Sequence, residues 1–214
     1  GDGLLALAYQ VLTNVETPEI LRIVRLFTQG ILDICEGQAF DKEFESRLDV
    51  SLQEYLMMIE RKTARLLAMS CEMGGLVSQV REQTLAKLNR FGSYLGRAFQ
   101  IQDDLLEVTS TMEVMGKSLG SDLFSKKKTY VLLKALELAD DNTKDHILSL
   151  LEENSRSEQE FEQAKELIAR TGVIQETEQK IRSIINDALA ILDQFDADVD
   201  LLKHFTLQLL NRKS

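Results

Sequence analysis

Apolar residues recur three and four positions apart through nearly the whole chain, and this spacing constrains the fold more than any other feature. Residues at that spacing share one face of an α-helix, whereas a half-buried strand alternates apolar and polar residues. The interruptions are short polar or glycine-bearing segments, and Pro18 is the single proline. The sequence therefore predicts an all-α fold in which amphipathic helices pack as an antiparallel helical bundle.

The interruptions divide this pattern into helices. Pro18 suits a first helical turn, and Gly37, the Gly74-Gly75 pair and Gly116 mark the main breaks. With 214 residues, of which 44% are hydrophobic, we expect residues 1–214 to form a single domain. The predicted helices are residues 1–14, 18–35, 50–71, 73–81, 83–110, 127–139, 143–153, 158–170, 172–196 and 198–211.

The charge of the chain limits its partners and its location. The formal net charge of -10 repels a polyphosphate backbone at long range, so we expect no nucleic-acid partner. No apolar run reaches the roughly 18 residues that a membrane span needs, and no signal segment opens the sequence. We therefore expect a soluble, cytoplasmic protein. The charge-rich residues 140–165 are predicted to form a solvated peripheral helix pair.

Residues 99–107 read FQIQDDLLE and place polar side chains in a long, otherwise apolar helix. Gln100, Asp103, Asp104 and Glu107 are three or four positions apart and crowd onto one helical face. Like charges at this spacing cost an isolated helix about 0.2–0.5 kcal/mol per pair, which a cation would offset. Mg2+ suits such a face because it commonly joins one or two carboxylates to substrate phosphates. The alternative is a solvated acidic face, since short motifs also match by chance.

A basic segment follows within one loop. Residues 116–130 read GKSLGSDLFSKKKTY, with Lys117 between two glycines and a lysine run that includes Lys127 before the next helix. Backbone N–H groups and the positive dipole end suit a helix start to anion binding. Alone, the segment reads as a solvated basic turn. Beside an acidic metal face, it indicates a place for a metal-bound diphosphate.

A third element is ERKTAR at residues 60–65, in a helix whose other positions are apolar. Taken alone, Lys62 and Thr63 read as a snorkelling surface pair. The sequence carries no Ser/His/Asp or Cys/His arrangement, so we do not expect a protein nucleophile.

These elements resemble, in order and register, the trans-isoprenyl diphosphate synthases, the family of farnesyl, geranylgeranyl and longer polyprenyl diphosphate synthases. FQIQDDLLE resembles the family's second aspartate-rich motif, FQxxDDxxD, and residues 116–130 resemble its GKxxGxDxxxxKxT segment. Residues 60–75 match its lysine-threonine helix, and Gly37-Gln38 with Asp41 resembles its GQxxD turn. The opening GDGLLALAYQVL is similar to the helix behind the first aspartate-rich motif. The last third of the chain agrees in helical character only.

The resemblance implies an isoprenoid synthase fold, a homodimer and a Mg2+-dependent prenyltransferase. Its reaction would condense an allylic diphosphate with isopentenyl diphosphate to a short-chain (C15–C20) prenyl diphosphate and release diphosphate. Asp103 and Asp104 would bind Mg2+, with Glu107 as a weaker or water-mediated ligand. The implied substrate residues are Lys62 and Lys127 on the leaving diphosphate with Lys117 assisting, Thr63 and Gln100 along the path of the carbocation, and Gln38 at the same cavity.

Two departures from the family pattern matter. Glu107 stands where the family has Asp, which lengthens one ligand by a methylene. The first aspartate-rich motif is missing from the sequence, so we expect an N-terminally incomplete synthase that is inactive as it stands. One alternative is a non-catalytic helical partner subunit of a complete synthase. Another terpenoid cyclase of the all-α class is disfavoured, because it does not account for the lysine-threonine and GKxxGxD elements.

Overall fold

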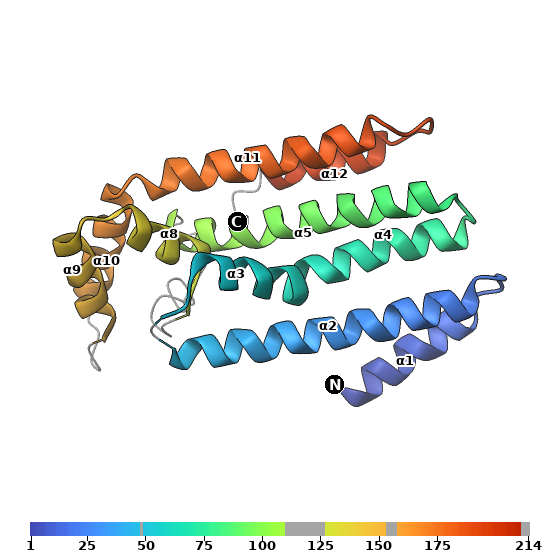
Figure 1. The fold of residues 1–214 in the computed structure, drawn as a ribbon, viewed down its shortest axis with the longest axis horizontal. Helices are drawn as coiled ribbons and strands as arrows, with labels where there is room; N and C mark the ends of the chain where they lie inside the picture. Colours follow the sequence, from blue (N-terminus) through green and yellow to red (C-terminus); the bar gives the residue numbers. More distant parts are fainter. Residues whose placement is uncertain (48, 110–126, 153–157, 211–214) are drawn as a thin grey trace.

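The structure is a computed structural model, which describes residues 1–47, 49–109, 127–152 and 158–210. Every regular element in these ranges is helical, so the predicted all-α fold is confirmed (Figure 1). The elements are α1 (Asp2–Thr13), α2 (Ile20–Ser46), α3 (Leu52–Ile59), the π-helical turn η1 (Glu60–Ala64), α4 (Arg65–Val77), α5 (Glu82–Thr109), α8 (Tyr130–Leu138), α9 (Asp141–Glu152), α10 (Glu158–Arg170), α11 (Val173–Leu192) and α12 (Asp200–Leu210).

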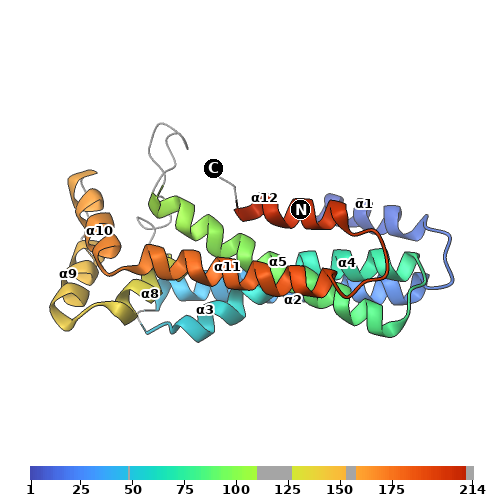
Figure 2. The same cartoon turned by 90° about the horizontal axis from the view of Figure 1, so that it is seen from above.

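The long helices lie side by side along the long axis of the molecule (Figure 1). Helix α5 lies at the centre and packs against α4, η1 and α11, while α2 packs against η1 and α4. Neighbours joined by short turns, such as α4 and α5, run antiparallel, as the sequence predicted. Figure 2 shows α1 and α12 on the same side of this bundle.

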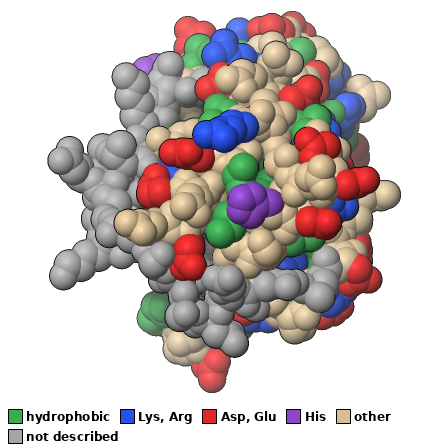
Figure 3. Space-filling view, turned by 90° about the vertical axis from the view of Figure 1, so that its left-hand side faces the viewer, with side chains coloured by type: hydrophobic (Ala, Val, Ile, Leu, Met, Phe, Trp, Pro, Cys, Tyr) green, Lys and Arg blue, Asp and Glu red, His purple; other side chains and the backbone are tan. Residues whose placement is uncertain are grey.

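Helices α9 and α10 pack against each other at one end of the bundle, where the sequence predicted a peripheral pair (Figure 1). Acidic side chains are spread over this end, with small groups of hydrophobic side chains between them (Figure 3). None of the helices in the described ranges is long and apolar enough to cross a bilayer.

The main hydrophobic core surrounds the second half of α5. Ala98 and Ile101 of this helix are completely buried, as are Val131 of α8 and Ile185 of α11. Ile59, at the end of α3, is 1% exposed and belongs to the same cluster. This packing fixes the part of α5 that carries the polar motif against α3, α8 and α11.

Helix α2 is longer than the sequence indicated, because Gly37 does not end it. The expected helix stopped at residue 35, but α2 continues to Ser46 and includes the residues predicted to form a GQxxD turn. An ideal Cβ at Gly37 would lie 2.4 Å from the backbone nitrogen of Lys62 and 2.7 Å from its Cα. The missing side chain therefore serves helix packing, since it lets the α2 backbone approach η1.

The predicted helices 50–71 and 73–81 are one rod, formed by α3, η1 and α4. Gly75 lies inside α4, where an ideal Cβ would be 2.7 Å from side-chain atoms of both Leu85 and Leu88. Here too a glycine permits two helices to pack closely, and does not mark a loop.

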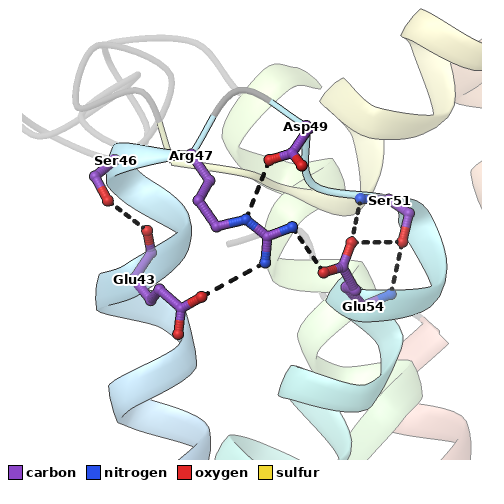
Figure 4. A network of polar contacts seen from close by, with 6 residues as sticks. All are labelled: Glu43, Ser46, Arg47, Asp49, Ser51 and Glu54. Atoms are coloured by element: carbon purple, nitrogen blue, oxygen red, sulfur yellow. Dashed lines mark hydrogen bonds and ion pairs between the residues drawn. The ribbon is translucent and has the colours of Figure 1, made fainter.

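A polar network closes the connection between α2 and α3 (Figure 4). Ser51 and Glu54 form a capping box, in which the Ser51 hydroxyl accepts from the Glu54 N–H and the Glu54 carboxylate accepts from the Ser51 N–H at 2.9 Å. Arg47 joins this box to the end of α2, through Glu54 at 2.9 Å, Asp49 at 3.1 Å and Glu43 at 3.5 Å. These contacts fix where α3 begins.

Candidate active site

The π-helical turn η1 interrupts the α3–α4 rod and carries two of the residues singled out in the sequence, Lys62 and Thr63. Such turns are rare and occur often at functional sites. Glycines of two neighbouring helices face this turn: Gly37 of α2 approaches Lys62, and an ideal Cβ at Gly96 of α5 would be 2.4 Å from Ala64 Cα. The turn is therefore wedged between α2 and α5.

Lys62 reaches α2, where its Nζ lies 2.6 Å from Oδ2 of Asp41. Asp41 is only 5% exposed, while the Lys62 side chain is partly exposed. The buried carboxylate thus holds the lysine in one position and neutralises its charge within a partly desolvated site.

Thr63 begins a chain of hydrogen bonds on α5. Its hydroxyl donates to Oε1 of Gln100 at 2.8 Å, and Nε2 of Gln100 donates to Oδ1 of Asp104 at 3.1 Å. These two bonds fix the orientation of the Gln100 amide, because its oxygen accepts while its nitrogen donates.

Asp104 is the end of this chain and is buried, with 5% exposure. Its Oδ2 accepts from the Tyr55 hydroxyl at 2.5 Å and from the Tyr130 backbone N–H at 2.7 Å. Burial raises the pKa of the Asp104 carboxyl to about 6, against the three hydrogen bonds and the charge of Lys127, which lower it. Burial and the nearby Asp104 charge raise the pKa of Tyr55 well above its ordinary value.

The negative charge at the start of α8 comes from the protein itself, from the Asp104 carboxylate. Thr129 caps this helix by accepting from the Leu132 N–H at 3.2 Å, and the N–H of Tyr130 donates to Asp104. The sequence predicted an anion site here for a diphosphate. In the structure a carboxylate of α5, that of Asp104, lies at the positive end of the α8 dipole, which favours a negative charge.

Asp103 and Glu107 differ from Asp104 in their exposure to solvent. Both are partly exposed and one helical turn apart, whereas Asp104 is buried against α3 and α8. In the ranges that the structure describes, no three His, Cys, Asp or Glu side chains are arranged to hold a metal ion. Of the three predicted carboxylate ligands, Asp104 is the one whose oxygens are bound by buried donors of the protein, the Tyr55 hydroxyl and the Tyr130 N–H. A carboxylate pair on one face still suits Mg2+, which keeps several waters and also binds substrate phosphates.

A small cavity lies where α2, α3, η1, α5 and the segment before α8 meet. Its volume is about 10 Å³, which is room for roughly one water molecule. Lys62, Gln100, Asp104 and Lys127, all singled out from the sequence, reach this cavity. The lining residues are Asp41, Tyr55, Met58, Ile59, Lys62, Gln100, Asp104, Lys127, Lys128 and Thr129.

The remaining predicted residues are placed as follows. Thr63 adjoins the cavity through its bond to Gln100, whereas Gln38 is exposed on α2 and does not line the cavity. Lys117 lies outside the described residues.

A larger pocket of about 420 Å³ lies on the other side of α8, between that helix, α9 and the start of α3. Its lining is mainly leucine, and the acidic residues on it, Asp49 and Glu137, are already paired with Arg47 and Lys134. It therefore lacks a carboxylate face for a metal, and the smaller cavity is the better candidate for chemistry.

The sequence did not point to Tyr55 as a site residue, nor to Asp41 beyond its place in a motif. Tyr55, Met58, Ile59 and Lys62 are spaced three, four and seven positions apart, and all four line the small cavity. That periodicity was visible in the sequence, because residues at this spacing share a helix face with the lysine. The partner of the Tyr55 hydroxyl was not visible, since Asp104 is 49 residues away.

Three comparisons relate the chain to known proteins. A curated relative, the geranylgeranyl diphosphate synthase of Sulfolobus acidocaldarius, is 38% identical over 174 residues, which cover 79% of this chain and 53% of the relative. The crystal structure of a geranylgeranyl pyrophosphate synthase superposes with a TM-score of 0.91 at 31% identity, covering 100% of this chain and 67% of that one. A polyprenyl synthase from Caulobacter crescentus, solved in complex with calcium and isoprenyl diphosphate, has a TM-score of 0.89 at 26% identity, with 100% and 65% covered.

The chain spans about half the length of the curated relatives it matches. The family model for polyprenyl synthetases matches residues 1–168, which hold all the site residues described above. The resemblance of the sequence motifs is thereby confirmed, and the chain belongs to the polyprenyl synthetase family.

Proposed function

We propose that this chain carries one half of the active site of a Mg2+-dependent prenyltransferase, the half that contains the second aspartate-rich motif. The single observation behind this proposal is that Lys62 of η1, Gln100 of α5 and Lys127 of the segment before α8 line one cavity beside the helix that also carries Asp103. The similar Caulobacter crescentus enzyme, crystallised with calcium and isoprenyl diphosphate, supports a site for a divalent cation and a prenyl diphosphate.

The proposed reaction transfers an allylic group to isopentenyl diphosphate. The allylic C–O bond breaks, and its electron pair leaves with diphosphate. The double bond of isopentenyl diphosphate then attacks the carbocation and forms the new C–C bond. The resulting cation loses a proton to the released diphosphate, so the products are a longer prenyl diphosphate and diphosphate. We propose a C15–C20 product, in keeping with the names of the curated relatives.

Each residue has a role that follows from its chemistry. Lys62 and Lys127 would bind the leaving diphosphate, while Asp103 and Glu107 would hold Mg2+. The bound ion would neutralise charge that develops on the leaving group. The oriented Gln100 oxygen and the Thr63 hydroxyl would present dipoles to the carbocation. No protein nucleophile takes part.

Exclusion of water decides how much the lysines contribute. One lysine–phosphate pair at 4 Å is worth about 1 kcal/mol in water and about 4 kcal/mol at an effective dielectric of 20. Asp41 and Asp104, which line the cavity, are both 5% exposed, so this side of the site is shielded from bulk water and favours the larger value.

Incorporation of labelled isopentenyl diphosphate into an acid-labile product tests this proposal in the natural protein that contains this chain. We expect a C15–C20 product with Mg2+ and an allylic primer, and none after EDTA treatment. A protein that gives no product with any primer would contradict the proposal. If product forms only when a complete synthase is added, the chain belongs to a non-catalytic partner subunit.

We also propose that the protein forms a homodimer in the cytoplasm. Support for the dimer comes from apolar side chains exposed on the two N-terminal helices: Leu4, Leu7 and Val11 of α1 are 73%, 55% and 68% exposed, and Leu21 and Leu32 of α2 are 70% and 53% exposed. Scattered apolar residues are normal on surfaces, but clustered ones are typical of interfaces. Light scattering that gives the monomer mass at micromolar concentration would exclude the dimer, and cell fractionation checks the location.

A further inference from the structure

The two adjacent aspartates of the acidic motif occupy very different surroundings. Asp104 is 5% exposed and accepts three hydrogen bonds, two on Oδ2 and one on Oδ1. Asp103 is partly exposed on the next side of α5. A carboxylate has about four lone-pair sites, so three of those on Asp104 are already in use.

The space beside Asp104 is too small for a hydrated metal ion. The cavity that it lines has a volume of about 10 Å³, which is room for roughly one water molecule and not for an ion that keeps several waters. Mg2+ requires octahedral coordination and normally keeps several waters. To reach an ion outside the cavity, Asp104 would have to leave the Tyr55 hydroxyl and the Tyr130 N–H, which are both buried donors. Stranding two buried donors is unfavourable.

The three donors to Asp104 come from different parts of the site. Tyr55 belongs to α3 and Gln100 to α5, and the Tyr130 N–H is the first donor of α8. Lys127 lies three residues before Tyr130 and lines the same cavity. Holding the start of α8 therefore also holds the segment that carries Lys127.

We propose that Asp104 is a positioning residue and not a metal ligand. It ties α3, α5 and the start of α8 together, and so fixes Lys127 and the Thr63–Gln100 pair relative to the metal-binding face at Asp103 and Glu107. This inference rests on the proposed function, because it assigns the metal to the neighbouring carboxylates. Of the two adjacent aspartates, Asp103 would then bind the metal ion, and Asp104 would hold the surrounding helices in place.

A matched pair of variants, Asp103→Asn and Asp104→Asn, tests the division, because each removes one negative charge from adjacent positions. Calorimetric titration with Mg2+ and inorganic diphosphate and thermal unfolding are measured on both. We expect Asp103→Asn to weaken Mg2+ binding about tenfold more than Asp104→Asn does. Asp104→Asn should lower Tm by about 2–4 °C or more, whereas Asp103→Asn should leave Tm unchanged or raise it.

The Tyr55→Phe variant tests the positioning role of Asp104 without any change of charge. It can be used even if Asp104→Asn does not fold. Loss of the hydroxyl removes one of the bonds that hold Asp104. We expect diphosphate affinity to fall by about three- to tenfold at a temperature well below unfolding, with Mg2+ affinity within about twofold of wild type. A purely structural tyrosine would lower Tm and leave diphosphate affinity alone.

Two different failures are distinguishable. If the unmodified protein binds no diphosphate in the presence of Mg2+, both the proposed function and this inference are contradicted. If the unmodified protein binds normally, but Asp104→Asn loses as much Mg2+ affinity as Asp103→Asn and keeps its Tm, then Asp104 is a ligand and the inference is overturned.

Discussion

Lys62 of η1 and Asp41 of α2 form an ion pair with 2.6 Å between Nζ and Oδ2, in which the carboxylate is 5% exposed. The approach of the two backbones at Gly37, four residues before Asp41, brings these side chains within reach. The pair places a cation beside the small cavity in a chain whose net charge is -10. The ion pair thus holds the lysine in place as a result of folding alone, so binding of an anion there would not have to order it.

Removal of Lys62 should leave the Asp41 carboxylate buried without its partner. We expect Lys62→Met to lower the free energy of unfolding by about 1–3 kcal/mol. The double variant Lys62→Met/Asp41→Asn should recover part of this loss, since it removes the unpaired charge. Urea unfolding of the two single variants and the double variant gives the coupling energy. Additive effects of the two substitutions would contradict the energetic importance of the pair.

Gly37→Ala should destabilise the protein, because the added Cβ would lie 2.4 Å from the Lys62 backbone nitrogen. Overpacking of this kind costs about 1–3 kcal/mol. Gly74→Ala is the matched control, since nothing lies within 4 Å of its added Cβ and alanine favours the helix by about 0.5–1 kcal/mol. Thermal unfolding should therefore give shifts of opposite sign. A stabilised Gly37→Ala protein would show that α2 and η1 are not as close as described.

Lys127→Ala should weaken the binding of inorganic diphosphate in the presence of Mg2+ by about tenfold, equivalent to about 1.4 kcal/mol. The physical reason is the loss of one cation beside the proposed diphosphate site. Lys134→Ala is the control in the helix that follows, α8, because Lys134 pairs with Glu137 at 3.3 Å and does not line the cavity. If calorimetric titration finds equal effects of the two substitutions on diphosphate affinity, Lys127 has no specific role in binding diphosphate.

The capping network at the start of α3 predicts a pH dependence of stability. Hydrogen bonds from Ser51 and Arg47 lower the pKa of Glu54 from its ordinary 4.5 to about 2. A carboxyl group whose pKa is lower in the folded state stabilises the fold above its unfolded pKa, and this contribution is lost as the pH falls through the folded value. The advantage of the wild type over Glu54→Gln should therefore shrink between about pH 4.5 and pH 2.

The measurement for this prediction is urea unfolding of both proteins across that pH range. Glutamine retains an oxygen that can accept from the Ser51 N–H, so the substitution tests the charge and its pairing with Arg47 more than the cap itself. A difference between the two proteins that stays constant from pH 7 to pH 2 would contradict the assignment.

Helical periodicity in the sequence was sufficient to predict the fold class and most helices. A helix that buries one face needs apolar residues about every 3.6 positions, and this pattern can be read from neighbouring residues alone. The helix at 158–170 was predicted with the bounds that the structure gives to α10, and 83–110 differs from α5 by one residue at each end. The predictions failed at Gly37 and Gly74-Gly75. A glycine that breaks a helix and one that permits close packing look alike until the neighbouring helix is known.

The sequence by itself determined the kinds of chemical group in the site and their order: a lysine and threonine, then an acidic helix face, then a lysine run. The tertiary structure decided which of these groups meet. It paired Lys62 with Asp41 and turned Asp104 toward Tyr55 and the start of α8. These partners are 21, 49 and 26 residues apart, and the packing of α2, α3 and α8 around the core of α5 brings them together. Local spacing contains no information about such contacts.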